Sequence, residues 1–364
     1  MIFINTQFKK IVSYIIFPLV LLSLVTAACA PQTPVPTETA TATPTTPPPT
    51  PTSLTTPRPT ATPTLPPLGA EGNPITIGFI LTPEDTAGSQ AAEDIAFLIE
   101  QDTGYQVEST LYPDFQSLST AVLNGDVDLF WLKPLEYIYL NWEGAAQVML
   151  LTNHLGVYAY GIRFFANVNR GFTPYFDLET NLSAGDPVAA LQQFSGTRPC
   201  FIEPLSLPGY LLPMGLLSNT STPVLDPVFV YNYEAVIRAL YIQGICDFGV
   251  SYALTGDART ASSILQDIPT AQQDVIVIWQ SEGIIPNINL SASTALSLAF
   301  QVEMREALLD LPNTPEGLNL LSTALNYDVE ALQAFDDSFY NPLRAAIIPL
   351  ALNLQELTQL GSDQ

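Results

Sequence analysis

Two stretches decide how this chain folds: Gly125-Asp126-Val127-Asp128-Leu129, and Gly244-Ile245-Cys246-Asp247-Phe248, which begins 119 residues later. In each stretch a Gly follows an amphipathic helical pattern, and an Asp stands at the start of an apolar run that predicts a buried strand. The same alternation of strand and helix precedes both. We therefore expect two similar α/β lobes, in which each stretch leads into the third strand of a sheet.

The segments around these stretches complete the two lobes. We expect strands at Ile75–Ile80, Gln106–Leu111, Val127–Leu132, Pro199–Glu203, Val228–Tyr231 and Cys246–Val250, and helices at Gly88–Gln101, Phe115–Asn124, Leu207–Ser218 and Glu234–Ile242. Strands and helices that alternate in this way are typical of doubly wound parallel sheets.

The apolar runs between the lobes predict a hinge. Tyr158–Val168 leads from the first lobe to the second, and Val275–Trp279 with Ile284–Leu290 leads back. Ala292–Leu311 and Pro315–Leu325 predict outer helices. Two lobes joined by two crossings form a cleft that can close over a ligand, beyond the carboxyl ends of the strands.

The amino terminus predicts export. Lys9-Lys10, the apolar run Ile11–Val25 and the small residues Thr26-Ala27-Ala28 precede Cys29, an order typical of a signal peptide that ends at a lipidated Cys. An uncleaved membrane anchor is the alternative, since the position three before the Cys is Thr26 rather than the usual Leu. The Pro- and Thr-rich stretch Pro31–Pro67 cannot bury a core and predicts a semi-stiff stalk.

These observations give the domain boundaries. We assign residues 1–28 to a signal peptide, 29–72 to a lipid-anchored linker, 73–158 to the first lobe, 159–284 to the second lobe, and 285–364 to the return and the C-terminal helices. The body is expected to be extracytoplasmic and held at the membrane by lipid on Cys29.

Charge and composition exclude several functions. The chain has 35 acidic and 11 basic residues, a formal net charge of −24, so it would be repelled by nucleic acid and has no long-range attraction for anions. The single His is His154, and no His/Cys cluster has metal-ligand spacing. No nucleophile elbow or phosphate-binding Gly-rich loop is present. We expect no catalytic residues, no metal and no cofactor.

Three blocks in the right order resemble a known family over roughly residues 75–340. They are Ile77-Gly78-Phe79 with Thr82-Pro83-Glu84-Asp85, then Asn124–Asp128 with Trp131, Pro134 and Tyr137, then Pro204-Leu205-Ser206-Leu207-Pro208-Gly209-Tyr210. Together they resemble the phosphonate/phosphite/phosphate-type substrate-binding proteins of bacterial ABC importers. The resemblance implies a two-lobed, type II periplasmic-binding-protein fold and ligand contacts from Thr82, Glu84, Tyr137, Ser206, Gly209 and Tyr210.

The sequence departs from that family at the anion cradle. The family's loop carries hydroxyls that hold an oxyanion at a helix amino terminus, whereas here only Ser206 remains, followed by Leu207 and Pro208. Lys133 stands where the family has Gly, and Asn232-Tyr233-Glu234 stands near the family's His. Tyr231, Asn232, Tyr233 and Tyr252 fall at strand ends or helix starts toward the cleft. Ordinary packing is the alternative for these rings. We expect a solute with an apolar or aromatic face.

Cys200 and Cys246 remain after Cys29 is assigned to the anchor. Two buried free thiols are one possibility. However, the first and third strands of a doubly wound lobe are neighbours, and both Cys residues open such strands at the same end. We therefore predict a disulfide between them.

The leading hypothesis is a lipid-anchored protein, expected to be a monomer, that captures a small solute and delivers it to an ABC permease and its ATPase. The alternative is the ligand-sensing receptor domain of a signalling system on the same fold. An enzyme is disfavoured, since no arranged pair of acid–base groups is visible.

Overall fold

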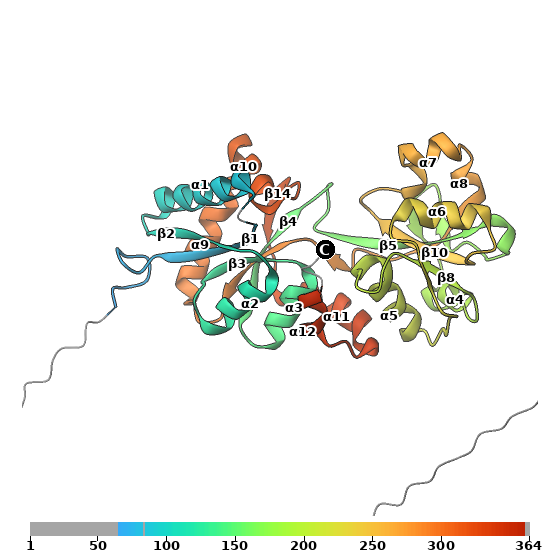
Figure 1. The fold of residues 1–364 in the computed structure, drawn as a ribbon, viewed down its shortest axis with the longest axis horizontal. Coiled ribbons are helices and arrows are strands. Elements are labelled where there is room, and N and C mark those ends of the chain that lie inside the picture. The colour runs from blue at the N-terminus through green and yellow to red at the C-terminus, as the bar shows by residue number, and fades with distance from the viewer. Residues whose placement is uncertain (1–64, 83, 361–364) are drawn as a thin grey trace, which may run out of the picture. The chain divides into compact units, whose positions relative to one another are not determined.

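The computed structural model describes residues 65–82 and 84–360, which form two α/β lobes (Figure 1). The predicted signal peptide, the lipidation site Cys29 and the linker up to residue 64 lie outside the described residues. Among the helices of the described ranges, none is both long and apolar enough to cross a membrane.

The first lobe is built on a six-stranded sheet of order β14-β4-β13-β3-β1-β2. Its strands are β1 (Ile75–Ile80), β2 (Val107–Tyr112), β3 (Leu129–Leu132), β4 (Ala146–Asn153), β13 (Asn289–Ser293) and β14 (Ala331–Ala334). One face carries α1 (Thr86–Thr103), α9 (Leu298–Asp310) and α10 (Pro315–Leu325). The other carries α2 (Phe115–Asn124) and α3 (Pro134–Trp142). Each face thus buries an apolar cluster.

The second lobe is built on a sheet of order β11-β5-β10-β8-β9, with β12 paired to β5. Its strands are β5 (Ala159–Asn167), β8 (Pro199–Phe201), β9 (Val228–Phe229), β10 (Phe248–Ala253), β11 (Val275–Gln280) and β12 (Ile285–Pro286), and a separate hairpin joins β6 (Phe176–Asp177) to β7 (Leu182–Ser183). Figure 1 shows α4 (Pro187–Gln192) and α5 (Leu212–Asn219) on one face, with α6 (Tyr233–Ile242), α7 (Ser262–Asp267) and α8 (Ala271–Asp274) on the other.

The strands predicted to be parallel are parallel in both lobes, but each sheet as a whole is mixed because strands that were not assigned a direction join it. The strands β1, β2 and β3 are parallel, as are β8, β9 and β10. In each lobe, however, a strand that arrives from the other lobe runs antiparallel beside the third strand: β13 beside β3, and β5 beside β10. The two lobes therefore share one topology, and in each sheet one strand is the segment by which the chain enters from the other lobe.

Two predicted elements begin later in the structure than expected. Ala292 and Ser293 belong to β13, so the helix expected at Ala292–Leu311 begins only at Leu298, where Ser297 caps it. Cys246 precedes β10, which begins at Phe248. The folded body also starts before the predicted boundary at 73, since the carbonyl of Gly69 accepts a hydrogen bond of 2.8 Å from the amide of Gln106.

The two Asp residues of the repeated stretches have the same role. Asp128 Oδ2 accepts a hydrogen bond of 2.9 Å from the amide of Thr76 in β1. Asp247 Oδ2 likewise accepts one of 2.7 Å from the amide of Arg198, just before β8. Each carboxylate therefore fastens the start of the first strand to the start of the third, a local contact that the two lobes repeat.

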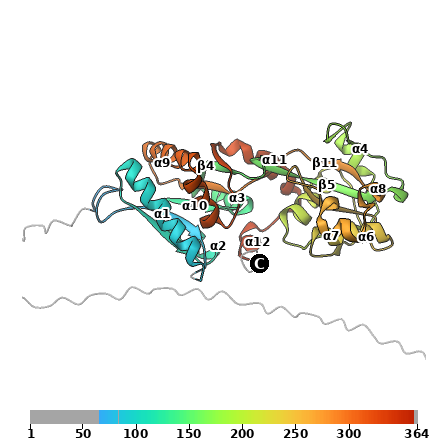
Figure 2. The same ribbon diagram turned by 90° about the horizontal axis from the view of Figure 1, so that it is seen from above.

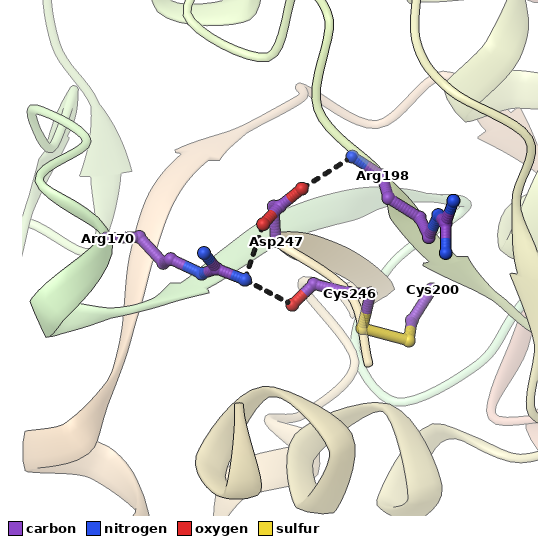
Figure 3. Close-up of a disulfide and its surroundings, with 5 residues drawn as sticks. All are labelled: Arg170, Arg198, Cys200, Cys246 and Asp247. Carbon is purple, nitrogen blue, oxygen red and sulfur yellow. Dashed lines mark hydrogen bonds and ion pairs between the residues drawn. A yellow bond between two sulfur atoms is a disulfide. The ribbon is translucent and has the colours of Figure 1, made fainter. Parts of the chain in front are cut away.

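Cys200 and Cys246 form a disulfide, with a Cα–Cα distance of 5.6 Å (Figure 3). Beside it, Asp247 pairs with a terminal nitrogen of Arg170, and the same nitrogen donates a hydrogen bond of 3.3 Å to the carbonyl of Cys246. The bridge joins the entrances of β8 and β10, which are neighbours in the sheet.

The C-terminal segment contacts both lobes. After β14 the chain forms short turns at Asp337–Tyr340 and Ile348–Leu350 around α11 (Asn341–Ile347), and then α12 (Leu354–Leu360). Figures 1 and 2 show α11 between the lobes. Arg344 of α11 donates to Asn141 of the first lobe at 2.7 Å, and Asn219 of α5 donates to the carbonyl of Ala345 at 3.1 Å. One apolar cluster consequently runs from α2 and α3 through α11 into the second lobe.

Candidate functional site

A cavity of about 370 Å³ lies where the two lobes, the crossings and α12 meet. Its walls come from the start of α3, from the loop before α5, from the crossing strands and from the C-terminal helix. The lining residues are Lys133, Pro134, Leu135, Glu136, Tyr160, Leu205, Leu207, Pro208, Pro286, Asn287, Ile288, Tyr327, Leu357 and Thr358. Most are apolar, as is usual for small-molecule sites.

The start of α3 supplies the charged groups of this cavity. Glu136 is 8% exposed, and its Oε2 accepts a hydrogen bond of 2.7 Å from the amide of Lys133, which caps the helix. Burial raises the pKa of Glu136, while the charge of Lys133 opposes that rise. The cavity thus holds one cation and one carboxyl group side by side, and the pair offers little net charge to an anionic ligand.

The crossings add neutral polar groups. The side-chain amide of Asn287 donates to the carbonyls of Val157 at 2.7 Å and Thr152 at 3.2 Å, and its Oδ1 is buried without a partner among the described residues. Burial raises the pKa of the Tyr160 and Tyr327 hydroxyls, so both stay protonated at neutral pH. These phenols and this amide provide neutral polar groups among the apolar walls.

Ser206 and Gly209 are hydrogen-bonded to each other within their loop. Ser206 Oγ accepts a hydrogen bond of 3.0 Å from the amide of Gly209 and caps a single π-helical turn at Leu207–Leu211. A Cβ at Gly209 would lie 2.4 Å from Ile202 Cγ1, so close packing explains this Gly. The neighbours Leu205, Leu207 and Pro208 face the cavity instead. The loop therefore presents an apolar surface at the position where the family described above has hydrogen-bond donors.

The predicted aromatic contacts form two packed groups in the second lobe. Tyr210 lies edge-on to Phe201 and Phe229, with centroid distances of 5.5 Å and 5.4 Å. Tyr233 packs edge-on against Tyr252 at 5.1 Å. Burial raises the pKa of Tyr233 to about 12, against the effect of a hydrogen bond with Ser206. These rings are placed by packing within the lobe.

The remaining predicted residues are dispersed. Asn232 Oδ1 accepts a hydrogen bond of 2.7 Å from the amide of Ala235 and caps α6, and Tyr231 is 72% exposed. Thr82 and Glu84 are exposed in the loop after β1. Tyr137 is completely buried, and its hydroxyl donates to Asp337.

None of these ten residues, all within the described chain, lines the interlobe cavity. Residues next to them in the sequence do line it: Lys133–Glu136, just before Tyr137, and Leu205, Leu207 and Pro208, on either side of Ser206. Tyr160, Asn287 and Tyr327 were missed by sequence reasoning. The only available signal was that Tyr160 and Asn287 lie in the runs predicted to cross between the lobes.

Arg163 is a second cation that could have served an anionic ligand. Arg163 pairs with Asp257 away from the interlobe cavity, and Lys133 is the cation that reaches the cavity. In the described chain, no group of three or more His, Cys, Asp or Glu side chains could hold a metal ion.

Comparison with solved structures identifies the fold. The structure of XAC2383 from Xanthomonas citri bound to chloride ion has a TM-score of 0.52 at 16% identity and covers 78% of this chain and 98% of that one. The ATP-bound form of XAC2383 has a TM-score of 0.51, also at 16% identity, with the same coverage. The chain thus has the two-lobed, type II periplasmic-binding-protein fold.

Comparison of sequences identifies the family. The phosphate-import protein PhnD of Mycolicibacterium smegmatis is 23% identical over 242 residues, which cover 62% of this chain and 69% of that protein. A family model described as the phosphonate-type periplasmic substrate-binding protein of ABC transporters matches residues 77–340. Proteins of this family capture solutes for ABC importers outside the cytoplasm and are not enzymes. This chain belongs to the family of phosphonate-type substrate-binding proteins of ABC transporters.

Proposed function

We propose that this protein captures a small solute with an apolar or aromatic face in the cavity between its lobes. The observation that carries the proposal is the lining: eight of the side chains facing the cavity are Pro, Leu or Ile, and Lys133 is beside the buried Glu136. Burial of apolar ligand surface against such walls is favourable by about 25 cal/mol per Å².

A phosphonate would find few free donors in this cavity. An oxyanion removed from water needs hydrogen bonds to nearly all its oxygens, because each unmet buried group costs about 1–3 kcal/mol. The amide of Gly209 already donates to Ser206 Oγ, and the hydroxyl of Ser206 is hydrogen-bonded to Tyr233. The name of the Mycolicibacterium smegmatis relative refers to phosphate import. For this chain we expect both phosphate and alkylphosphonates to be poor ligands.

A melting screen of the purified protein tests this proposal. A ligand at a hundred times its Kd stabilises a protein by about 2.7 kcal/mol, which raises the melting temperature by several degrees. We expect no such shift with phosphate, phosphite or alkylphosphonates, and a clear shift with an uncharged or aromatic solute. Native mass spectrometry of the freshly purified protein would identify a co-purified solute.

Two matched variants locate the solute. Leu207→Trp fills the cavity and should abolish the shift, whereas Leu298→Trp, on the exposed surface of α9, should retain it. A large shift with millimolar phosphonate that is abolished by Leu207→Trp would contradict the proposed ligand class and leave the cavity as the site.

We further propose that lipid on Cys29 holds the protein at the membrane and that the Pro- and Thr-rich stretch after it acts as a stalk. The order of basic, apolar and small residues before Cys29 supports this. Metabolic labelling with palmitate should mark the wild type, and Cys29→Ala should be unlabelled and mislocalised. A Cys29→Ala protein that stays membrane-bound like the wild type would instead identify Ile11–Val25 as an uncleaved anchor.

A further inference from the structure

Arg163 is a buried cation outside the interlobe cavity. It lies in β5, opposite Ser251 of β10 and Gln280 of β11, and is 3% exposed. A buried charge is costly unless it is paired and hydrogen-bonded. The partners of Arg163 therefore decide whether its charge is already neutralised within the protein.

Asp257 is the acidic partner of Arg163, but it is mainly engaged elsewhere. Arg259 contacts both oxygens of Asp257, through Nε at 3.1 Å and 3.2 Å and through a terminal nitrogen at 2.7 Å. Arg163 reaches Asp257 Oδ2 only at 3.4 Å. Two guanidinium groups thus share one carboxylate, and the cluster keeps a formal charge of about +1, since Arg is always protonated.

The other hydrogen bonds of Arg163 go to neutral amides. Nε donates to Gln280 Oε1 at 2.6 Å, and one terminal nitrogen donates to Asn181 Oδ1 at 3.1 Å. The guanidinium also lies over the ring of Phe176, 5.3 Å from its centroid. These contacts fix the plane of the guanidinium without adding negative charge, so its terminal N–H groups can serve a further acceptor.

A cavity of about 350 Å³ opens beside this cluster. Arg163 and Asp257 line it together with the polar side chains of Asn181, Thr260 and Gln272. It shares no lining residue with the interlobe cavity. The cavity therefore combines a held guanidinium, uncompensated positive charge and neutral polar side chains, within a chain whose net charge is −24.

We propose that this cavity binds a small oxyanion, such as sulfate or a small organic acid, with Arg163 as its principal ligand. Two terminal N–H groups of a guanidinium match the spacing of two oxygens on a carboxylate, sulfate or phosphate group. Thr260 and Gln272 supply hydroxyl and amide donors at the rim. The site lies on the second lobe and is independent of the solute captured between the lobes.

The test is equilibrium dialysis of the full chain against radiolabelled sulfate, and separately against radiolabelled malonate, at low salt to limit screening. We expect saturable binding of one equivalent of at least one probe. Binding of neither probe overturns the proposal.

Variants assign the bound anion to this cavity. Arg163→Gln removes the side chain that would bind the anion, but it also disrupts a buried hydrogen-bond network. Asn181→Asp is therefore the sharper variant. It keeps the acceptor for Arg163 and adds the missing negative charge, at a backbone position with φ of 56° that Asp tolerates. We expect at least tenfold weaker anion binding with no loss of melting temperature.

Two controls should bind the anion like the wild type. Arg198→Gln removes an exposed Arg elsewhere on the same lobe, and Leu207→Trp fills the interlobe cavity. Unchanged anion affinity in Asn181→Asp, or loss of binding in Leu207→Trp, would overturn the proposal.

Discussion

The hydroxyl of Tyr137 donates a hydrogen bond of 2.6 Å to the carboxylate of Asp337, which lies 200 residues further along the chain. Arg344 donates to the same carboxylate at 2.9 Å and to Asn141 of α3 at 2.7 Å. A Tyr expected to contact the ligand thus fastens the C-terminal segment to the first lobe.

Tyr137→Phe should lower the free energy of unfolding by roughly 1.5–3 kcal/mol, because the buried hydroxyl bonds to a charged group. Urea unfolding measures the change. Tyr139→Phe is the matched control on the same helix, since Tyr139 is also buried but packs edge-on against Phe115; it should change stability far less. Equal effects of the two substitutions would contradict the assigned role of Tyr137.

Reduction of the Cys200–Cys246 disulfide should destabilise the body. The bridge spans 46 residues, and a loop of that length corresponds to roughly 4 kcal/mol of chain entropy in the unfolded state. Urea unfolding with and without reductant measures the loss. Peptide mapping of the denatured, unreduced protein after thiol alkylation should leave both residues unlabelled, and labelling of both would refute the bridge.

Asp257 should make stability depend on pH. Burial acts to raise its pKa, but the hydrogen bonds and charge of Arg259, with the charge of Arg163, outweigh it and hold the pKa below its usual value. A lowered pKa means that the stabilisation is fully present above about pH 4, where the unfolded group titrates, and is lost as the pH falls through the lower folded value.

Asp257→Asn should therefore cost about 3–5 kcal/mol at neutral pH, because it leaves two buried guanidinium groups without a carboxylate. The difference from the wild type should shrink as the pH falls below about 4. Unfolding measured across this pH range tests both statements; a difference that stays constant would show that Asp257 is not the titrating group.

Gly215 of α5 should resist substitution. A Cβ there would lie 2.0 Å from the carbonyl oxygen of Ala346 in α11, a distance that forces the two helices apart. Gly215→Val should lower the melting temperature by several degrees, since overpacking costs about 1–3 kcal/mol. Ser218→Ala, at an exposed position of the same helix, serves as the control. A melting temperature equal to that of the control would contradict this close approach.

Sequence patterns predicted the features that depend on which strands are neighbours in a sheet. The pairing of Cys200 with Cys246 follows from the adjacency of β8 and β10, and the repeated Asp128 and Asp247 indicate matching strand entrances. The antiparallel direction of the crossing strands was not predicted, because an antiparallel crossing strand is as apolar as a parallel one. Its direction depends on the lobe from which it arrives.

The lining of the interlobe cavity could not be predicted in the same way. Ser206 followed by Gly209 fits an anion cradle and a helix cap equally well, and only the observed hydrogen bond distinguishes them. Tyr160 and Asn287 come from the two crossings and Tyr327 from the segment after α10, and only the folded chain brings them to one cavity. Contacts between residues so far apart in the sequence leave no pattern in the local sequence.

The chain enters the second lobe through β5 and returns to the first through β13. The second lobe is therefore one continuous stretch of chain, and the first lobe is built from two separate stretches. Residues 159–286 hold all strands of the second sheet, whereas the first sheet lacks β13 and β14 until the last part of the chain is present. During export from the amino terminus, the second lobe can complete its sheet while the first still exposes the edge of β3. The lobe whose strands come first in the chain is thus the last to have all of them available.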